Sequence, residues 1–181
     1  MTADWLRHRF GADATWLPFD LHPEYPPEGI PREQLHARYG SGFHDRLERM
    51  FEQAGLAYKP PPDVVPNTRR ALRVTELARE RGLHGAVHDR LMDAYWADEQ
   101  NIGDPAVLLA LVVEVGLDAV EVEDVLDSER YGDLVAASTA QAHSIGVNGI
   151  PAFLLDRRLL VLGVQPREVF EQAFARLEAP D

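Results

Sequence analysis

A histidine between two carboxylates is the first group of residues in this sequence that could do chemistry. His22 lies between Asp20 and Glu24 in the segment DLHPEY, and a histidine beside carboxylates can serve as a general acid or base near neutral pH. The apolar alternation before it predicts a strand, and sites in open sheets gather just beyond strand ends. The competing interpretation is a loop histidine that stabilises the turn, and we favour it.

Two further constellations contain histidine at helical spacing. His84 and His88 are four residues apart, so a helix would place both on one face, as a metal pair requires. No third ligand is evident nearby, and exposed helix residues are the better interpretation. Thr139, beside Ser138, is four residues before His143, but no orienting acid accompanies them. We therefore assign no catalytic residue and no metal site.

The composition excludes several classes of function. The 181 residues include no cysteine, which excludes a disulfide framework, a thiolate metal site and a redox pair within them. The net charge of -12 argues against binding to nucleic acid or to an anionic membrane. The N-terminus has no apolar signal core, and the longest apolar stretch is too short to span a bilayer. We expect a cytoplasmic protein with a small-molecule or protein partner.

Hydrophobic periodicity predicts a chain that is mostly helical. Helices are expected at about residues 2–10, 41–55, 67–82, 83–95, 104–116, 118–127 and 130–145, with a last one from Pro166. Ser41, Asn67 and Asp104 are the expected caps of three of them. The very apolar helix that starts at Pro105 is predicted to be the buried centre of the bundle.

Strands are expected only near the two ends of the chain. Residues 14–21 alternate apolar and polar side chains, and Pro18 would place this strand at a sheet edge. The apolar runs 152–155 and 159–162, joined by residues 156–158, predict a β-hairpin. The loop around residues 22–31 is too rich in proline for regular structure.

Five segments, in this order and spacing, resemble the thioredoxin fold of the DsbA family. They are Trp16–Gly29 (WLPFDLHPEYPPEG), Val65–Thr68 (VPNT), Asn101–Leu108 (NIGDPAVL), Gly146–Leu155 (GVNGIPAFLL) and Gly163–Ala173 (GVQPREVFEQA). The resemblance covers almost the whole chain from about Ala3 onward. It is closest to the FrnE-like branch, which is related to 2-hydroxychromene-2-carboxylate isomerases and kappa-class glutathione transferases.

This resemblance implies an α/β protein with a thioredoxin-like fold and an inserted all-helical domain. Residues 1–30 and 147–181 would form the thioredoxin-like domain, and residues 31–146 the insertion. In the family the proline that starts the corresponding strand follows a cis peptide bond, and the backbone before it pairs with an extended peptide or with glutathione. Here that bond is Ile150–Pro151, and we expect both residues to bind substrate.

The resemblance also suggests a ligand role for Asn67, because an asparagine in a similar segment of the isomerases faces the ligand cleft. Helix capping is the alternative explanation for Asn67. The expected partner is a peptide or protein thiol or disulfide, or glutathione; no bound cofactor is expected, and a homodimer stays open.

One departure from the family is as informative as the match. Members that do thiol chemistry begin with a strand and a Cys-x-x-Cys turn, whereas this sequence begins inside what resembles the following helix. Three explanations stay open: a start assigned too far downstream, which we favour; a non-catalytic member whose sheet a partner strand completes; or another way of closing the sheet. Two functions are compatible with these explanations. One is a thiol–disulfide oxidoreductase, and the other is a cysteine-free isomerase-like or binding protein.

Overall fold

The computed structural model describes residues 2–39, 42–59 and 62–178, and the predicted cap Ser41 lies outside them. In chain order the elements are α1 (Thr2–Phe10), β1 (Ile30–Pro31), α2 (Arg32–Tyr39), α3 (Gly42–Gln53), β2 (Val64–Val65), α4 (Arg69–Glu80), α5 (His84–Trp96), α6 (Pro105–Glu114), α7 (Ala119–Asp127), α8 (Gly132–Ser144), β3 (Ala152–Leu155), β4 (Leu159–Leu162) and α9 (Arg167–Glu178). The predicted helices, the hairpin and the C-terminal helix are therefore confirmed.

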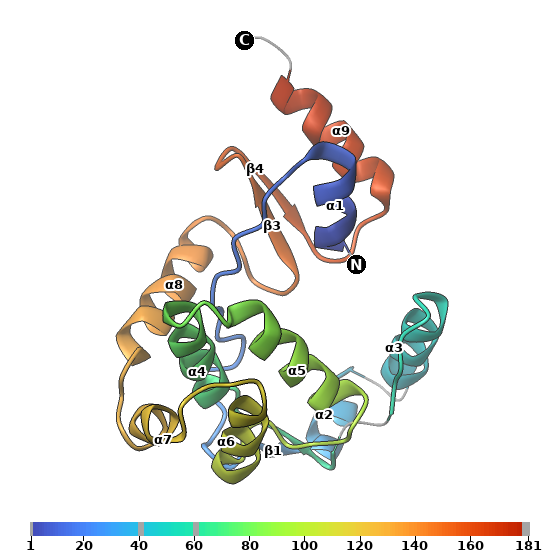
Figure 1. The fold of residues 1–181 in the computed structure, drawn as a ribbon. Coiled ribbons are helices and arrows are strands. Elements are labelled where there is room, and N and C mark those ends of the chain that lie inside the picture. The colour runs from blue at the N-terminus through green and yellow to red at the C-terminus, as the bar shows by residue number, and fades with distance from the viewer. Residues whose placement is uncertain (1, 40–41, 60–61, 179–181) are drawn as a thin grey trace.

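Two apolar clusters divide the fold, as Figure 1 shows. One holds α1, the β3–β4 hairpin and α9, which lie together at one end of the molecule. The other is a layer of helices that includes α4 to α7, with α8 leading back toward the hairpin. Residues 11–20, blue in Figure 1, connect the two parts.

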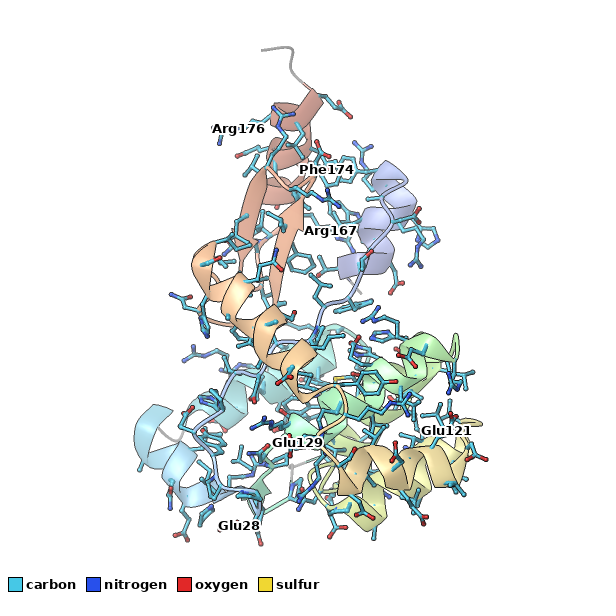
Figure 2. All side chains as sticks on the ribbon, turned by 90° about the vertical axis from the view of Figure 1, so that its left-hand side faces the viewer. Glu28, Glu121, Glu129, Arg167, Phe174 and Arg176 are labelled. Atoms are coloured by element: carbon cyan, nitrogen blue, oxygen red, sulfur yellow. The ribbon has the colours of Figure 1, made fainter. Side chains whose placement is uncertain are left out.

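The hairpin packs one face against two helices. Leu155 and Val161 are buried with Leu6 of α1 and with Phe170 of α9. The rings of Phe10 and Phe174 stack at 4.0 Å between the two helices, and Figure 2 shows Phe174 pointing from α9 toward α1. An isolated two-stranded hairpin is marginally stable in water, so these helices supply the apolar surface that stabilises it.

The centre of the helical layer is α4, and the prediction that the helix starting at Pro105 is its centre is wrong. Seven side chains of α4 are buried: Ala71, Arg73, Val74, Thr75, Glu76, Leu77 and Ala78. By contrast, α6 buries Leu108, Leu111 and Val112 and leaves Val113 exposed. The helix α4 is central because α5, α7 and α8 all contact it. The apolar composition of a helix alone does not determine its position in the bundle.

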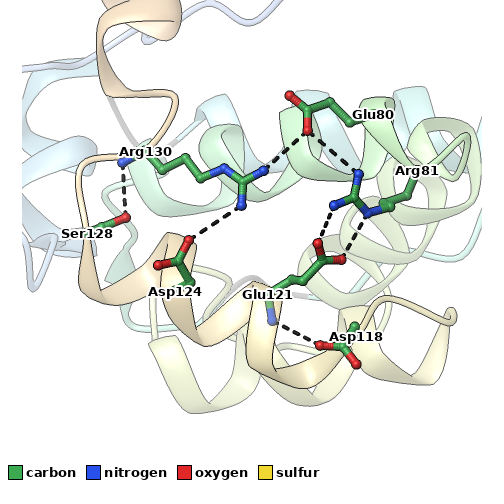
Figure 3. Close-up of polar contacts among 7 residues, drawn as sticks. All are labelled: Glu80, Arg81, Asp118, Glu121, Asp124, Ser128 and Arg130. Atoms are coloured by element: carbon green, nitrogen blue, oxygen red, sulfur yellow. Dashed lines mark hydrogen bonds and ion pairs between the residues drawn. The ribbon is translucent and has the colours of Figure 1, made fainter.

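Charged groups join α7 and the turn that follows it to α4. Arg73 is only 3% exposed and donates hydrogen bonds to the carbonyl groups of Ser128 and Leu126 at the end of α7. A cation at a helix C-terminus interacts favourably with the helix dipole. Figure 3 shows a second set of contacts at the surface, in which Arg81 pairs with Glu121 and Arg130 bridges Glu80 and Asp124.

The expected strand over residues 14–21 is wrong. Among the residues that the structure describes, no strand pairs with this segment, and its backbone groups bond to helix side chains instead. The Trp16 carbonyl accepts from Arg79 at 2.6 Å, and the Pro18 carbonyl accepts from Ser138 at 2.7 Å. Because a strand needs a neighbouring ladder, the alternating pattern here yields extended chain without a sheet.

A short strand pair that the sequence does not predict joins Ile30–Pro31 to Val64–Val65. Gly29 makes this pairing sterically feasible. Its φ is +81°, and a Cβ there would lie 2.3 Å from the Val65 carbonyl oxygen. Only glycine fits such a close approach at a positive φ.

Candidate functional site

The Ile150–Pro151 turn connects the loop after α8 to the first residue of β3, and its peptide bond is cis. The Pro151 carbonyl accepts a hydrogen bond of 2.7 Å from the Gly163 amide, which extends the β3–β4 pairing by one residue. Ile150 is 59% exposed. The turn is thus fixed on its β4 side while Ile150 is accessible to solvent.

The register of the hairpin determines where the backbone groups of β3 point. Bonded and non-bonded pairs alternate along an antiparallel ladder. Since Pro151 bonds to Gly163, the pairs Ala152↔Leu162 and Leu154↔Leu160 are the non-bonded ones. The amides and carbonyls of Ala152 and Leu154 therefore point away from β4. Within the parts of the chain that the structure describes, no other strand pairs with β3.

Apolar side chains line this free edge and the sheet face beside it. Leu154 is 48% exposed, and Leu162 on β4 is exposed as well. Both belong to the face opposite the one packed on α1 and α9. Exposed apolar side chains beside unpaired strand groups are the features that an added strand would use.

Asn67 lies at the start of α4, two residues before the helix begins. Its side-chain amide donates to the Tyr25 carbonyl at 2.7 Å, and its Oδ1 accepts from the Arg69 amide at 2.9 Å. These bonds tie the loop around Tyr25 to the first turn of α4. They account for an asparagine at this position without a ligand, and the ligand role stays a prediction.

The Asp20, His22 and Glu24 constellation is split by the structure. Asp20 is 7% exposed, and burial raises the pKa of its carboxyl group. His22 pairs instead with Glu24, with Nδ1 and Oε1 3.0 Å apart, and its ring stacks on Tyr25 at 4.4 Å. This arrangement fits the interpretation of His22 as a turn-stabilising residue.

The hydroxyl and histidine group on α8 makes bonds to the backbone. Thr139 Oγ1 donates to the Val135 carbonyl and accepts from the Asp20 amide. His143 Nδ1 lies 2.9 Å from the carbonyl oxygen of Val147, the residue after the turn that ends α8. These contacts hold the connecting segments, and no bond joins Thr139 to His143.

His84 and His88 lie on one face of α5, as their spacing predicts, with ring centroids 6.2 Å apart. His88 also stacks on Trp16 at 4.9 Å, a contact that the sequence does not predict. In the described ranges, no group of three or more His, Cys, Asp or Glu side chains could hold a metal ion. His88 thus packs Trp16 against α5.

Comparison with known proteins places this geometry in a family. The family of DsbA-like thioredoxin domains matches residues 4–175. The chain belongs to this family. Within the described residues of this DsbA-like domain, no helix has the length and apolar character needed to cross a membrane.

Two relatives match most of the DsbA-like domain. A crystal structure of a probable DsbA oxidoreductase from Streptomyces coelicolor is 35% identical and has a TM-score of 0.85, with 96% of this chain and 80% of that chain covered. An uncharacterized protein of Bacillus subtilis, YwbO, is 26% identical over 165 residues, which are 90% of this chain and 81% of the relative.

A second solved structure is similar in fold. The 2-hydroxychromene-2-carboxylate isomerase structure has a TM-score of 0.75 at 19% identity, covering 96% of this chain and 85% of that chain. Both structural likenesses confirm the expected thioredoxin-like fold with a helical insertion.

Proposed function

We propose that this DsbA-like domain is the polypeptide-holding part of a thiol–disulfide oxidoreductase, with Ile150, Pro151 and the free edge of β3 as its docking site. An N-terminal strand of the kind that the family carries would occupy the same edge, so a polypeptide docks along β3 where that strand is absent. The observation that carries the proposal is the pair of outward-pointing residues Ala152 and Leu154 beside the exposed Ile150. An extended chain laid along this edge would gain main-chain hydrogen bonds from both residues.

The side chains around the edge favour an apolar segment. Ile150 and Leu154 are exposed, and Leu162 stands beside them on β4. An unfolded protein exposes such segments, whereas a folded one buries them. Substrates of this domain are therefore unfolded or partly folded polypeptides, which are also the proteins whose cysteines are accessible to exchange.

Exchange chemistry needs sulfur from outside these 181 residues. In exchange a thiolate attacks one sulfur of a disulfide, a mixed disulfide forms, and the other sulfur leaves as a thiolate. The chain has no cysteine, so another polypeptide segment or a small thiol such as glutathione must supply the attacking group. The domain then holds the polypeptide beside that thiol.

The docking step can be tested without any thiol. The probe is a fluorescein-labelled, cysteine-free peptide of alternating valine and threonine, and binding is followed by fluorescence anisotropy. Leu154→Pro removes an outward amide and leaves the bonds to β4 intact, which is where a strand tolerates proline. Leu154→Ala removes the side chain but retains the amide.

The two variants should behave differently. We expect Leu154→Pro to weaken binding at least about tenfold and Leu154→Ala by about threefold or less, because the main-chain bonds supply most of the affinity in strand addition. Circular dichroism on both variants verifies that the hairpin unit is folded. Equal affinities of the two folded variants would overturn the proposed site.

A further inference from the structure

The helix α3 carries an apolar stripe that the rest of the chain leaves largely uncovered. Leu47, Met50, Phe51 and Ala54 share one face at helical spacing. None of the α3 side chains whose exposure is described is buried, and Met50 is 39% exposed. Helices in proteins owe most of their stability to packing of such a face, so an uncovered stripe indicates a partner.

Aromatic residues continue this surface from α3 onto α5. The Phe51 ring lies 5.2 Å from Tyr58 and 5.3 Å from Trp96. Exposed Met92 is four residues before Trp96 on α5, and exposed Leu56 follows α3. We call the set Met50, Phe51, Leu56, Tyr58, Met92 and Trp96 the α3 patch. Aromatic and methionine side chains are enriched in the centres of protein interfaces.

Acidic groups lie beside the patch. Asp89 and Asp93 are exposed, and their spacing places them on the face of α5 that carries Met92 and Trp96. Burial raises the pKa of the Tyr58 hydroxyl; the nearby charge of Arg32 opposes this effect, and that of Glu48 adds to it. Arg46 lies on the other edge of the α3 stripe, so the acidic side of the patch is the side formed by α5.

The acidic character continues from α5 along the chain, whereas residues 32–59, which include α3, contain five basic and four acidic side chains. Residues 84–133 contain thirteen acidic and two basic side chains. Both basic side chains are already paired, since Arg90 contacts Asp98 and Glu114, and Arg130 contacts Glu80 and Asp124. A cationic partner is attracted to this surface, whereas a second copy of the chain would bring the same excess of negative charge.

We propose that the α3 patch docks a cationic amphipathic segment of another protein. Apolar side chains of that segment cover Phe51 and Trp96, and its lysines or arginines face Asp89 and Asp93. This site is separate from the edge of β3, so it is independent of the proposed function and can fail without it.

The test uses two labelled peptides and the full chain. One peptide is an amphipathic helix of leucine and lysine, and the other has glutamate in place of every lysine. Anisotropy gives the affinities, and light scattering gives the oligomeric state. The variant Asp89→Lys/Asp93→Lys reverses charge at the patch, and Glu123→Lys/Asp127→Lys makes the same charge change on exposed residues of α7 as the matched control.

We expect the lysine peptide alone to bind. The α5 double variant should weaken it at least about tenfold and the α7 control by less than about threefold, since steering falls with distance from the contact. Met92→Ala should weaken binding several-fold through loss of apolar contact. Equal losses in the two charge variants, equal binding of both peptides, or a dimer that excludes the peptide would each overturn the proposal.

Discussion

The Asp20 amide donates a hydrogen bond of 2.9 Å to Thr139 Oγ1, across 119 residues of sequence. This bond ties the extended segment that follows α1 to α8, the helix that leads to the Ile150–Pro151 turn. Thr139 also donates to the Val135 carbonyl, so its buried hydroxyl makes two hydrogen bonds.

Removing that hydroxyl should destabilise the fold. Thr139→Val retains the shape of the side chain but leaves the Asp20 amide without its partner, which costs about 1–3 kcal/mol for a buried donor. Thr139→Ser retains the hydroxyl and should cost less. Urea unfolding followed by circular dichroism gives both free energies of unfolding, and equal values for the two variants would contradict the importance of this bond.

Asp20 should make stability depend on pH in a known direction. Burial raises the pKa of Asp20 above its ordinary value of 3.8, so the folded state holds this proton more tightly than the unfolded state does. Protonated Asp20 therefore contributes to the stability of the folded state at low pH. This contribution is lost as pH rises from about 3.8 through the higher pKa of the folded state.

Asp20→Asn removes this penalty. The variant should be more stable than the parent chain at pH 7, and the difference should shrink as pH falls below 4. Free energies of unfolding at several pH values test this. A variant that is less stable at pH 7 would show that Asp20 forms a charge interaction stronger than its burial cost.

His84 should make the free energy of unfolding depend on pH in the opposite direction. Burial, with the nearby charge of Arg79, lowers the pKa of His84 below 6.5. The unfolded state then takes up the proton first, so stability falls as pH drops below about 6.5. His84→Gln should lose less stability than the parent between pH 7 and pH 5. His88→Gln serves as the comparison on the same helix face, and an unchanged slope in His84→Gln would contradict the assignment.

Gly29 and Gly11 allow a controlled test of the β1–β2 contact. Both have positive φ, but a Cβ meets the Val65 carbonyl only at Gly29, while nothing lies within 4 Å at Gly11. Gly11→Ala should cost about 1 kcal/mol for the conformation alone. Gly29→Ala should cost clearly more, because backbone must also move. Thermal unfolding of both variants measures the two losses of stability. Equal losses would contradict the close approach of Gly29 to the Val65 carbonyl.

Local signals in the sequence account for much of the fold. The Asp104 side chain accepts from the amides of Ala106 and Val107, as its predicted capping position requires. The Asp118 side chain accepts from the Glu121 amide in the same way. The hairpin follows from two apolar runs around a short polar turn. Such features depend on neighbouring residues alone.

Other features depend on contacts that local patterns do not contain. Residues 14–21 have the period of a strand, but strand formation also needs a neighbour, and helix side chains satisfy this backbone instead. The Asp20 amide donates its hydrogen bond to Thr139, which is 119 residues away. The free edge of β3 follows from the register with β4 and cannot be read from residues 152–155 alone.

The most direct test of the docking site is amide hydrogen exchange in the hairpin, measured by NMR with and without a saturating valine and threonine peptide. The amides of Phe153 and Leu155 face β4, whereas those of Ala152 and Leu154 face away from it. A peptide docked along β3 should slow exchange at Ala152 and Leu154 and have little effect at Phe153 and Leu155. Unchanged exchange at Ala152 and Leu154 under saturation would contradict docking at this edge.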